Sequence, residues 1–382
     1  MRITIVFGFF LPVPPVLGGS TEKIWYRLAK EFADAGHSVT LVSRRWGRWP
    51  SREIEDATPI RHIRLPGCRH SRFLPINLLL DGLWGALVAC NLPPSDIVIC
   101  NVVSLPIYLR LVRPSVGKVA AVLGRMPKGQ NRAYGAVDLL LATSEAVAAK
   151  VLAENRSLQS KVFRFANPID WGLHKESSSQ DAAEVVVIGY IGRIHPEKGL
   201  ELLLDAASLL AKRSDLPNWR LELVGPVAVG EGGGGEQYKS GLLERYQRLL
   251  GDRLVFRSPV YDAEELAKYY GRISIFCYPS LAFKGEGLSI APMEAMAGGA
   301  VAVVSKLDCY RDLIKPNVNG FQFDHTLPDA NNQLAKILEE LMCDRQLRTA
   351  VAGVGQLDVQ RHDYKESAGA LLQEFEKVVK KD

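Results

Sequence analysis

The stretch VVVIGYIGRIHPEKGLELLLDAASLL, residues 185–210, decides the fold class. It opens with a short apolar run rich in valine and isoleucine, which is typical of a buried strand. A turn carrying Arg193 and Lys198 follows, and a helix is expected from about Leu200 to Lys212. A strand, a short turn and a helix in this order predict one unit of a parallel sheet that is covered by helices.

The same alternation runs through the chain on both sides of this stretch. Strands are expected at 2–9, 38–43, 96–101, 118–124, 138–144, 220–225, 253–260, 273–280 and 300–305. The first helix is expected to begin with Ser20 or Thr21 as its N-cap and to end at Gly36, and another helix is expected near 242–250. Because residues 175–184 are polar and lack periodicity, we interpret them as a linker or loop.

The predicted fold is therefore α/β, with two Rossmann-like, doubly wound domains. We expect a first domain at 1–168 and a second at 169–361, with a last helix at about 362–382 packing back on the first. A chain of 382 residues is too long for one ordinary core, so two domains agree with its length.

Composition and charge limit the classes of function. With 47% hydrophobic and 23% charged residues the chain resembles a soluble enzyme, and its longest apolar stretch, 76–90, is interrupted by Asn77 and Asp81. Prolines at 12, 14 and 15 argue against a signal peptide, and six scattered cysteines suggest reduced thiols, so a cytoplasmic location is expected.

The charge is divided unevenly between the two predicted domains. Through Pro168 there are 22 Lys and Arg against 11 Asp and Glu, or +11, and the remainder has 25 against 31, or −6. A basic first half suits a membrane surface, an anionic substrate or nucleic acid. No nucleic-acid-binding motif is present, so nucleic acid is not expected as a partner.

Ligands of open parallel sheets bind beyond the carboxyl ends of the strands, so the residues that follow each strand are informative. Gly18 and Gly19 follow the first strand, and Arg193 and Lys198 follow the strand at 185–192. Backbone N–H groups at a helix start and two cations make a clamp for phosphate or diphosphate. The stretch GEGLSIAPMEAMAGG, 285–299, adds two carboxylates, and carboxylates suit sugar or ribose hydroxyls.

At these residues the sequence resembles a known family. GYIGRIHPEKGLELLLDAASLL and GEGLSIAPMEAMAGG are similar to the G-R-x-x-x-x-K-G and E-x7-E elements of retaining glycosyltransferases of family 4, which have the GT-B fold. The GG before the first helix and the pieces AGHSVTLVS, ATSEAVAAKV, FANPID and NGFQF agree. The resemblance covers nearly the whole chain.

The resemblance implies a role for each residue of the candidate site. Arg193 and Lys198 would hold the donor diphosphate, Glu286 would hold the transferred sugar, and these three would be catalytic. Glu294 would bind the ribose. The backbone contacts implied for the donor lie at Gly18, Gly19, Val260, Tyr261, Gly287, Leu288 and Ser289.

The expected donor is a UDP-hexose, with UDP-glucose first, and the expected acceptor is a glycan or lipid-linked saccharide in polysaccharide biosynthesis. No cofactor or metal is expected, because D-x-D is absent and two cations with helix ends can neutralise the leaving diphosphate. Retention without an evident nucleophile suggests attack on the face that the diphosphate leaves, with the leaving phosphate accepting the acceptor's proton.

One departure concerns the first domain. Many members carry a histidine where VLGRMPKGQ stands here, and this chain has Gly124 and Arg125 instead. Asn101 and Arg125 are therefore candidates for the acceptor side. The segment RRWGRWPSR, 44–52, is either a solvated loop or a basic and aromatic surface for lipid headgroups, which would place the protein at the inner face of the cell membrane.

Three other classes of protein are alternatives to a glycosyltransferase. A GT-B nucleotide-sugar epimerase would share the two-domain pattern but not the pair of motifs. A nicotinamide oxidoreductase needs G-x-G-x-x-G after the first strand, which GFFLPVPPVLGG does not supply. A non-catalytic scaffold would not need to retain both cations and both glutamates.

Overall fold

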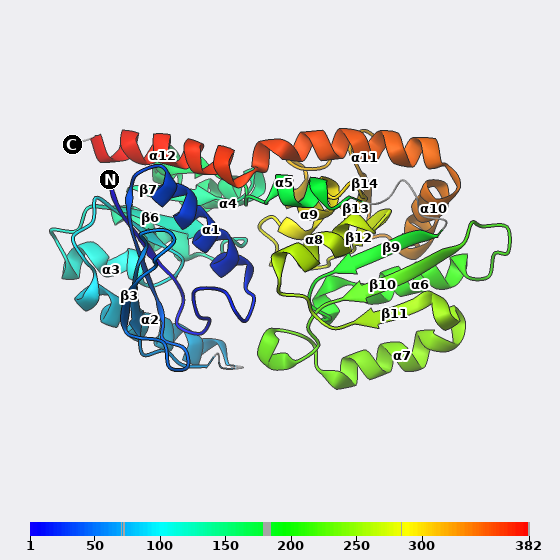
Figure 1. The fold of residues 1–382 in the computed structure, drawn as a ribbon, viewed down its shortest axis with the longest axis horizontal. Coiled ribbons are helices and arrows are strands. Elements are labelled where there is room, and N and C mark those ends of the chain that lie inside the picture. The colour runs from blue at the N-terminus through cyan, green and yellow to red at the C-terminus, as the bar shows by residue number, and fades with distance from the viewer. Residues whose placement is uncertain (70, 72, 179–184, 284, 381–382) are drawn as a thin grey trace. The chain divides into compact units, whose positions relative to one another are not determined.

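The structure is a computed structural model, and it describes residues 1–69, 71, 73–178, 185–283 and 285–380. The chain divides into two compact units (Figure 1). Unit 1 comprises Met1–Pro168 and Tyr364–Asp382, and unit 2 comprises Ile169–Asp363. Of the expected linker at 175–184, residues 179–184 lie outside the described residues, and 175–176 end a helix.

Unit 1 is built on a sheet of eight strands. Their order is β3(Arg52–Ile54), β4(Arg61–Leu65), β2(Ser38–Arg44), β1(Arg2–Val6), β5(Ile97–Cys100), β6(Lys118–Leu123), β7(Leu139–Ala142) and β8(Val162–Arg164). All neighbours are parallel except β3 and β4, which are antiparallel. Strand β1 lies at the centre, with Ile3 opposite Val39 on one side and Ile97 on the other.

The helices of unit 1 are α1(Ser20–Asp34), α2(Leu74–Asn91), α3(Leu105–Val112), α4(Glu145–Glu154) and α12(Tyr364–Lys380). The strands are buried on both faces, as parallel strands under helices must be, so they read as continuous apolar runs. The last helix packs on the first, where the Phe32 and Phe375 rings meet edge to face at 6.0 Å.

Helix α1 begins at Ser20, a residue that was predicted to precede the helix as its N-cap. Ser20 is its first helical residue, and Gly19 occupies the N-cap position at a φ of 96°. The predicted cap at Ser20 or Thr21 is therefore wrong, because the chain turns into the helix through glycine and no side-chain cap forms.

Unit 2 is built on a sheet of six parallel strands. Their order is β11(Leu254–Arg257), β10(Trp219–Val224), β9(Val186–Ile191), β12(Ile275–Tyr278), β13(Val301–Ser305) and β14(Phe321–Phe323). The chain winds outward from β9 to one edge and then returns to the other side of β9 at β12. This reversal is the topological switch point at which doubly wound sheets bind their ligands.

The helices of unit 2 are α5(Trp171–Glu176), α6(Leu200–Leu210), α7(Glu236–Leu250), α8(Ala263–Gly271), α9(Ile290–Ala297), α10(Ala330–Cys343) and α11(Arg345–Val359). Helix α7 begins six residues before the predicted start, directly after the glycines at 232–235. With a parallel sheet in each unit, the predicted α/β class with two Rossmann-like domains is confirmed.

Candidate functional site

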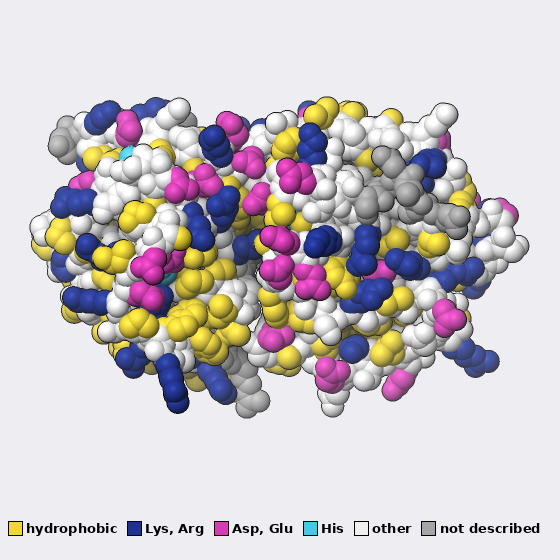
Figure 2. All heavy atoms as spheres, viewed as in Figure 1, with side chains coloured by type: hydrophobic (Ala, Val, Ile, Leu, Met, Phe, Trp, Pro, Cys, Tyr) yellow, Lys and Arg dark blue, Asp and Glu magenta, His cyan; other side chains and the backbone are white. Residues whose placement is uncertain are grey.

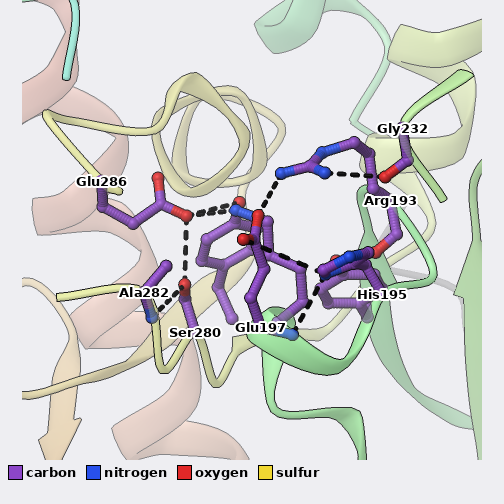
Figure 3. A network of polar contacts seen from close by, with 10 residues as sticks. Arg193, His195, Glu197, Gly232, Ser280, Ala282 and Glu286 are labelled. Carbon is purple, nitrogen blue, oxygen red and sulfur yellow. Dashed lines mark hydrogen bonds and ion pairs between the residues drawn. The ribbon is translucent and has the colours of Figure 1, made fainter. Parts of the chain in front are cut away.

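Two loops of unit 2 meet beyond the carboxyl ends of β9 and β12, on the two sides of the switch point. The first, 192–199, carries Arg193 and Lys198, and the second, 279–289, carries Glu286. Strands β9 and β12 are adjacent in the sheet, so the two motifs are joined in space although nearly 90 residues separate Lys198 from Glu286. Figure 3 draws the resulting network of polar contacts.

Arg193 is held by the backbone of a glycine-rich loop and by a carboxylate. Its Nη1 donates to the Gly232 carbonyl at 2.7 Å, and its Nη2 contacts Glu197 (Figure 3). Partial burial opposes ionisation of Glu197, but the charges of Arg193 and Lys198 outweigh it and lower the carboxyl pKa. The guanidinium therefore already has an anion beside it, and an incoming phosphate would have to share it or replace it.

His195, which lies between the two cations, has a structural explanation. Its Nδ1 accepts a hydrogen bond from the Glu197 N–H at 3.2 Å and so caps the short 3-10 turn Pro196–Lys198. Burial lowers the pKa of the ring, which favours the neutral form that can accept this bond.

Lys198 and Glu286 form a buried ion pair. The two residues are 6% and 8% exposed, and the Lys198 ammonium contacts Glu286 Oε1. The same oxygen accepts a hydrogen bond from Ser280 at 3.0 Å, and the Tyr278 hydroxyl lies 3.4 Å away. The sequence predicted separate roles for this lysine and this glutamate, whereas the structure makes them one unit.

Aromatic rings enclose this ion pair. The Lys198 Nζ lies 5.2 Å from the centre of the Tyr278 ring, and Tyr278 stacks on Tyr190 at 5.7 Å. Burial raises the pKa of both phenols well above their usual value, so the hydroxyls stay protonated. The Tyr190 hydroxyl donates to the Arg193 carbonyl at 2.8 Å and fixes the turn. Neutral donors around a paired charge make a site that is preorganised for a polar ligand.

Sequence reasoning missed Ser280, Tyr278 and Glu197. Ser280 and Tyr278 were identifiable in principle, because they stand at the carboxyl end of a predicted strand. Glu197 lies inside the motif that drew attention to Arg193 and Lys198.

The backbone expected to contact the transferred sugar leads directly into α9. Gly287 and Leu288 lie in the loop, Leu288 is buried, and Ser289 is the N-cap residue of α9. The loop is closed by a bond from the Glu286 N–H to the Ala282 carbonyl at 2.8 Å. This turn holds the Glu286 backbone in place next to the N-terminus of α9.

Glu294 lies on α9 in a different environment from Glu286. It is 3% exposed, and its Oε1 lies 3.7 Å from Nε2 of the buried His174 on α5. It is also bonded to Tyr270, whose phenol has its pKa raised well above the usual value by burial, and further by Glu294. The sequence did not predict His174 or Tyr270 as its partners, since neither lies near it in the chain.

The expected base-binding residues lie after β11. Val260 is half-buried, and Tyr261 is 47% exposed with its hydroxyl bonded to Glu231. Glu231 belongs to the segment that leads into the glycines at 232–235, so this segment contacts both Tyr261 and Arg193.

In unit 1, Gly18 and Gly19 turn the chain into α1 at φ values of 75° and 96°. The Gly18 N–H donates to the Pro15 carbonyl at 3.0 Å, so this bond would have to be given up for the N–H to bind an anion. Glu22, in the first turn of α1, lies close against Gly19. Burial raises the pKa of this carboxyl to about 7, and the sequence gave no reason to single it out.

Asn101 and Arg125 follow β5 and β6. Both amide atoms of the Asn101 side chain are buried and have no hydrogen-bond partner among the described residues, whereas Arg125 is exposed. His37 contacts the N-terminal amine and His62 pairs with Glu55, so both are structural. His70 lies outside the described residues.

The described residues contain no group of three or more His, Cys, Asp or Glu that would hold a metal ion. Independence of metal remains a prediction.

Comparisons with known proteins show which proteins this chain is similar to. Residues 175–354 match the family model of glycosyl transferases group 1. A lipopolysaccharide core biosynthesis mannosyltransferase of Rhizobium meliloti is 28% identical over 182 residues, which cover 47% of this chain and 48% of that protein. A phosphatidyl-myo-inositol mannosyltransferase of Mycobacterium tuberculosis is 28% identical over 191 residues, which cover 50% and 46%. The chain thus spans about half the length of the curated relatives it matches.

Solved structures share the whole fold. A sucrose-phosphate synthase from Thermosynechococcus elongatus gives a TM-score of 0.76 at 18% identity, with 99% of this chain and 98% of that chain covered. Anabaena HepE in complex with UDP and glucose gives 0.72 at 18% identity, with 99% and 100% covered. The fold is GT-B, and residues 175–354 are a domain of the glycosyl transferases group 1 family.

Proposed function

We propose that the protein is a retaining glycosyltransferase of family 4 that moves a hexose from a UDP-sugar, UDP-glucose first, to a glycan or lipid-linked saccharide in polysaccharide biosynthesis. The observation that carries the proposal is the buried Lys198–Glu286 pair beside Arg193, built by two loops at the switch point of unit 2. A mixed site of this kind offers cations to a diphosphate and a carboxylate to sugar hydroxyls.

The proposed roles combine these contacts with the resemblance of the two motifs. Arg193 presents its guanidinium to the diphosphate, and the ammonium of Lys198 moves from Glu286 toward a phosphate oxygen as the donor binds. Glu286 then accepts hydrogen bonds from the sugar, supported by Ser280. Glu294 binds the ribose, and the base lies near Val260 and Tyr261.

The reaction is proposed to retain the anomeric configuration without a covalent glycosyl intermediate. A carboxylate that accepts hydrogen bonds from Ser280 and from the sugar hydroxyls, as proposed for Glu286, makes a weak nucleophile because these bonds offset its charge. The acceptor hydroxyl would attack on the face that the diphosphate leaves, and the departing phosphate oxygen would take its proton. Proton NMR of the product tests the retention, since an α-linked product from an α-linked donor is expected and a β-linked product contradicts it.

The identity of the donor is tested by thermal shift with UDP, UDP-glucose, other UDP-hexoses and GDP-mannose. GDP-mannose is included because the relatives found by sequence are named as mannosyltransferases. A ligand at 100 times its dissociation constant stabilises the folded state by about 2.7 kcal/mol. No stabilisation by any nucleotide sugar would overturn the proposal, and isomerisation of a donor incubated alone would indicate an epimerase instead.

A further inference from the structure

Helix α2 leaves an apolar face in solvent. Large side chains at its N-cap and along its length are between 45% and 67% exposed, namely Phe73, Leu74, Ile76, Leu78, Leu79 and Leu83. Ile76, Leu79, Leu83, Ala86 and Cys90 are spaced by three and four residues, which places them on one stripe of the helix. The two sets together are called the α2 face, which consists of the exposed residues Phe73, Leu74, Ile76, Leu78, Leu79, Leu83, Ala86 and Cys90. Figure 2 shows hydrophobic side chains gathered over the part of unit 1 where Figure 1 labels α2.

The opposite side of α2 is fixed to the core of unit 1. Trp84 is buried and its Nε1 donates to the Phe7 carbonyl at 2.9 Å, and Val88 packs in the same cluster. The single acidic residue of α2, Asp81, is buried and accepts the Ser104 N–H at 2.7 Å. One side of the helix is thus held in the core of unit 1, and it is the one helix among the described residues long and apolar enough to span a bilayer. Its exposed apolar face is available where it lies.

A helix that is apolar all round is normally enclosed by protein, yet only 28% of the residues of α2 are buried. Contiguous apolar surface of this kind marks a contact with another protein or with a membrane. We propose that the α2 face inserts into the headgroup and acyl boundary of an anionic bilayer. The inference deepens the proposed function, because a lipid-linked acceptor would be reached from that surface.

Charge favours an anionic bilayer over a second copy of the chain. The first 168 residues carry +11, so two copies placed face to face would repel each other. The α2 face itself has no exposed carboxylate, and Arg69 is exposed just before the helix. Arg45, also exposed, directly follows β2, and its N–H bonds to the Leu65 carbonyl at 2.8 Å. Exposed apolar side chains on a unit with a net positive charge suit an interface with anionic lipids.

The two tryptophans of the predicted 44–52 surface contact other residues of unit 1, so we assign the apolar lipid contact to α2 instead. Arg44 lies 5.0 Å from the Trp46 ring and donates to the Phe10 carbonyl, and the buried Arg64 lies 5.0 Å from the Trp49 ring. The two rings are therefore engaged with side chains of the same unit. From this loop Arg45 and Arg48 remain as exposed cations, while α2 supplies the apolar contact.

Co-sedimentation with vesicles of phosphatidylglycerol and phosphatidylcholine tests the inference on the full chain. Wild-type protein is expected to bind anionic vesicles, to ignore neutral ones, and to lose binding as salt rises. L79E/L83E is expected to weaken binding at least tenfold. The matched control L249E/L357E, at exposed leucines of unit 2, should bind like wild type. Melting curves check folding, and L79Q/L83Q replaces the glutamate variant if that variant is unfolded.

Each outcome decides between occupants of the α2 face. Binding of L79E/L83E and L79Q/L83Q equal to wild type, or wild-type protein left in the supernatant at low salt, overturns the inference. A dimer in sedimentation velocity that L79E/L83E dissociates would assign the face to a second copy and also overturn it. Calorimetry with UDP in the absence of vesicles tests the proposed function separately, so either failure is recognised by itself.

Discussion

At the scale of single residues, buried carboxylates gain their properties from their neighbours. Glu286 is bound by an ammonium, whereas Glu22 is buried beside glycine, and its pKa is raised to about 7. The two carboxyl groups have the same intrinsic chemistry, and the difference arises because one has a cation partner and the other is desolvated.

Removing Lys198 should affect stability and donor binding together. Lys198→Ala leaves the buried Glu286 carboxylate without its cation, which costs about 3–5 kcal/mol of unfolding free energy. The double variant Lys198→Ala/Glu286→Gln should recover much of this loss, because no buried charge remains. Denaturant unfolding of the two single variants and the double variant measures the coupling, and additive losses would contradict the pairing.

Glu22 should make stability depend on pH. Its carboxyl pKa is 4.5 when unfolded and about 7 when folded, so the folded state binds the proton more tightly. Stability from this group is therefore present below pH 4.5 and lost as the pH rises to about 7, by about 3 kcal/mol. As the pH rises from 4.5 to 8, the unfolding free energy of Glu22→Gln should therefore increase relative to that of wild type by about 3 kcal/mol, as measured by denaturant unfolding. A pH-independent difference between the two proteins would refute this.

At the scale of elements, the loop before α7 positions Arg193. Gly232 has a φ of 83°, and a Cβ there would lie 2.9 Å from Arg193 Cδ. Its neighbours are tied down, because the N–H groups of Gly234 and Gly235 donate to the carbonyls of Ile194 and Val227 at 2.7 and 2.8 Å. The loop is thus a fixed support for the guanidinium.

Gly232→Ala should therefore displace Arg193 and weaken binding of UDP. A residue with a Cβ in this conformation costs about 1–2 kcal/mol of stability, and the arginine must also move. Gly230→Ala is the control, since a Cβ there meets nothing within 4 Å. Calorimetry with UDP compares the two variants, and equal affinities would show that the loop does not position Arg193.

Helix α9 and the loop before it should divide the binding of nucleotide from that of sugar. Glu294→Ala should weaken UDP itself, because the ribose loses a contact that contributes about 1.5–3 kcal/mol. Glu286→Ala should leave UDP affinity unchanged or raised, since Lys198 becomes available to phosphate, but should reduce transfer. Calorimetry and turnover on the same preparations decide this, and equal loss of UDP binding in both variants would refute the division.

At the scale of the whole molecule, the predicted chemistry is independent of metal. In the proposed function, Arg193, Lys198 and the N-terminus of α9 would supply the positive charge that a leaving diphosphate needs. Activity should therefore survive treatment with EDTA. If EDTA abolished activity and added Mg²⁺ or Mn²⁺ restored it, the proposal would be contradicted.

The sequence by itself predicted β1, β2, β5, β6, β7 and the five strands from β9 to β13, together with the residues at the carboxyl ends of β9 and β12, but it did not predict β3, β4, β8 or β14. Apolar runs and turn residues are local signals, so Arg193, Lys198, Glu286 and Glu294 could be found without coordinates. The start of α1 was misplaced, because the conformation of Gly19 and not a side-chain cap decides it.

Only the tertiary structure decided which of these residues are partners. Lys198 meets Glu286, and Glu294 meets His174, through contacts between segments far apart in the chain, and periodicity carries no information about such contacts. The raised pKa of Glu22 and the exposure of the α2 face likewise depend on what packs nearby. An apolar helix looks the same in sequence whether protein covers it or not, so burial had to be seen in the folded chain.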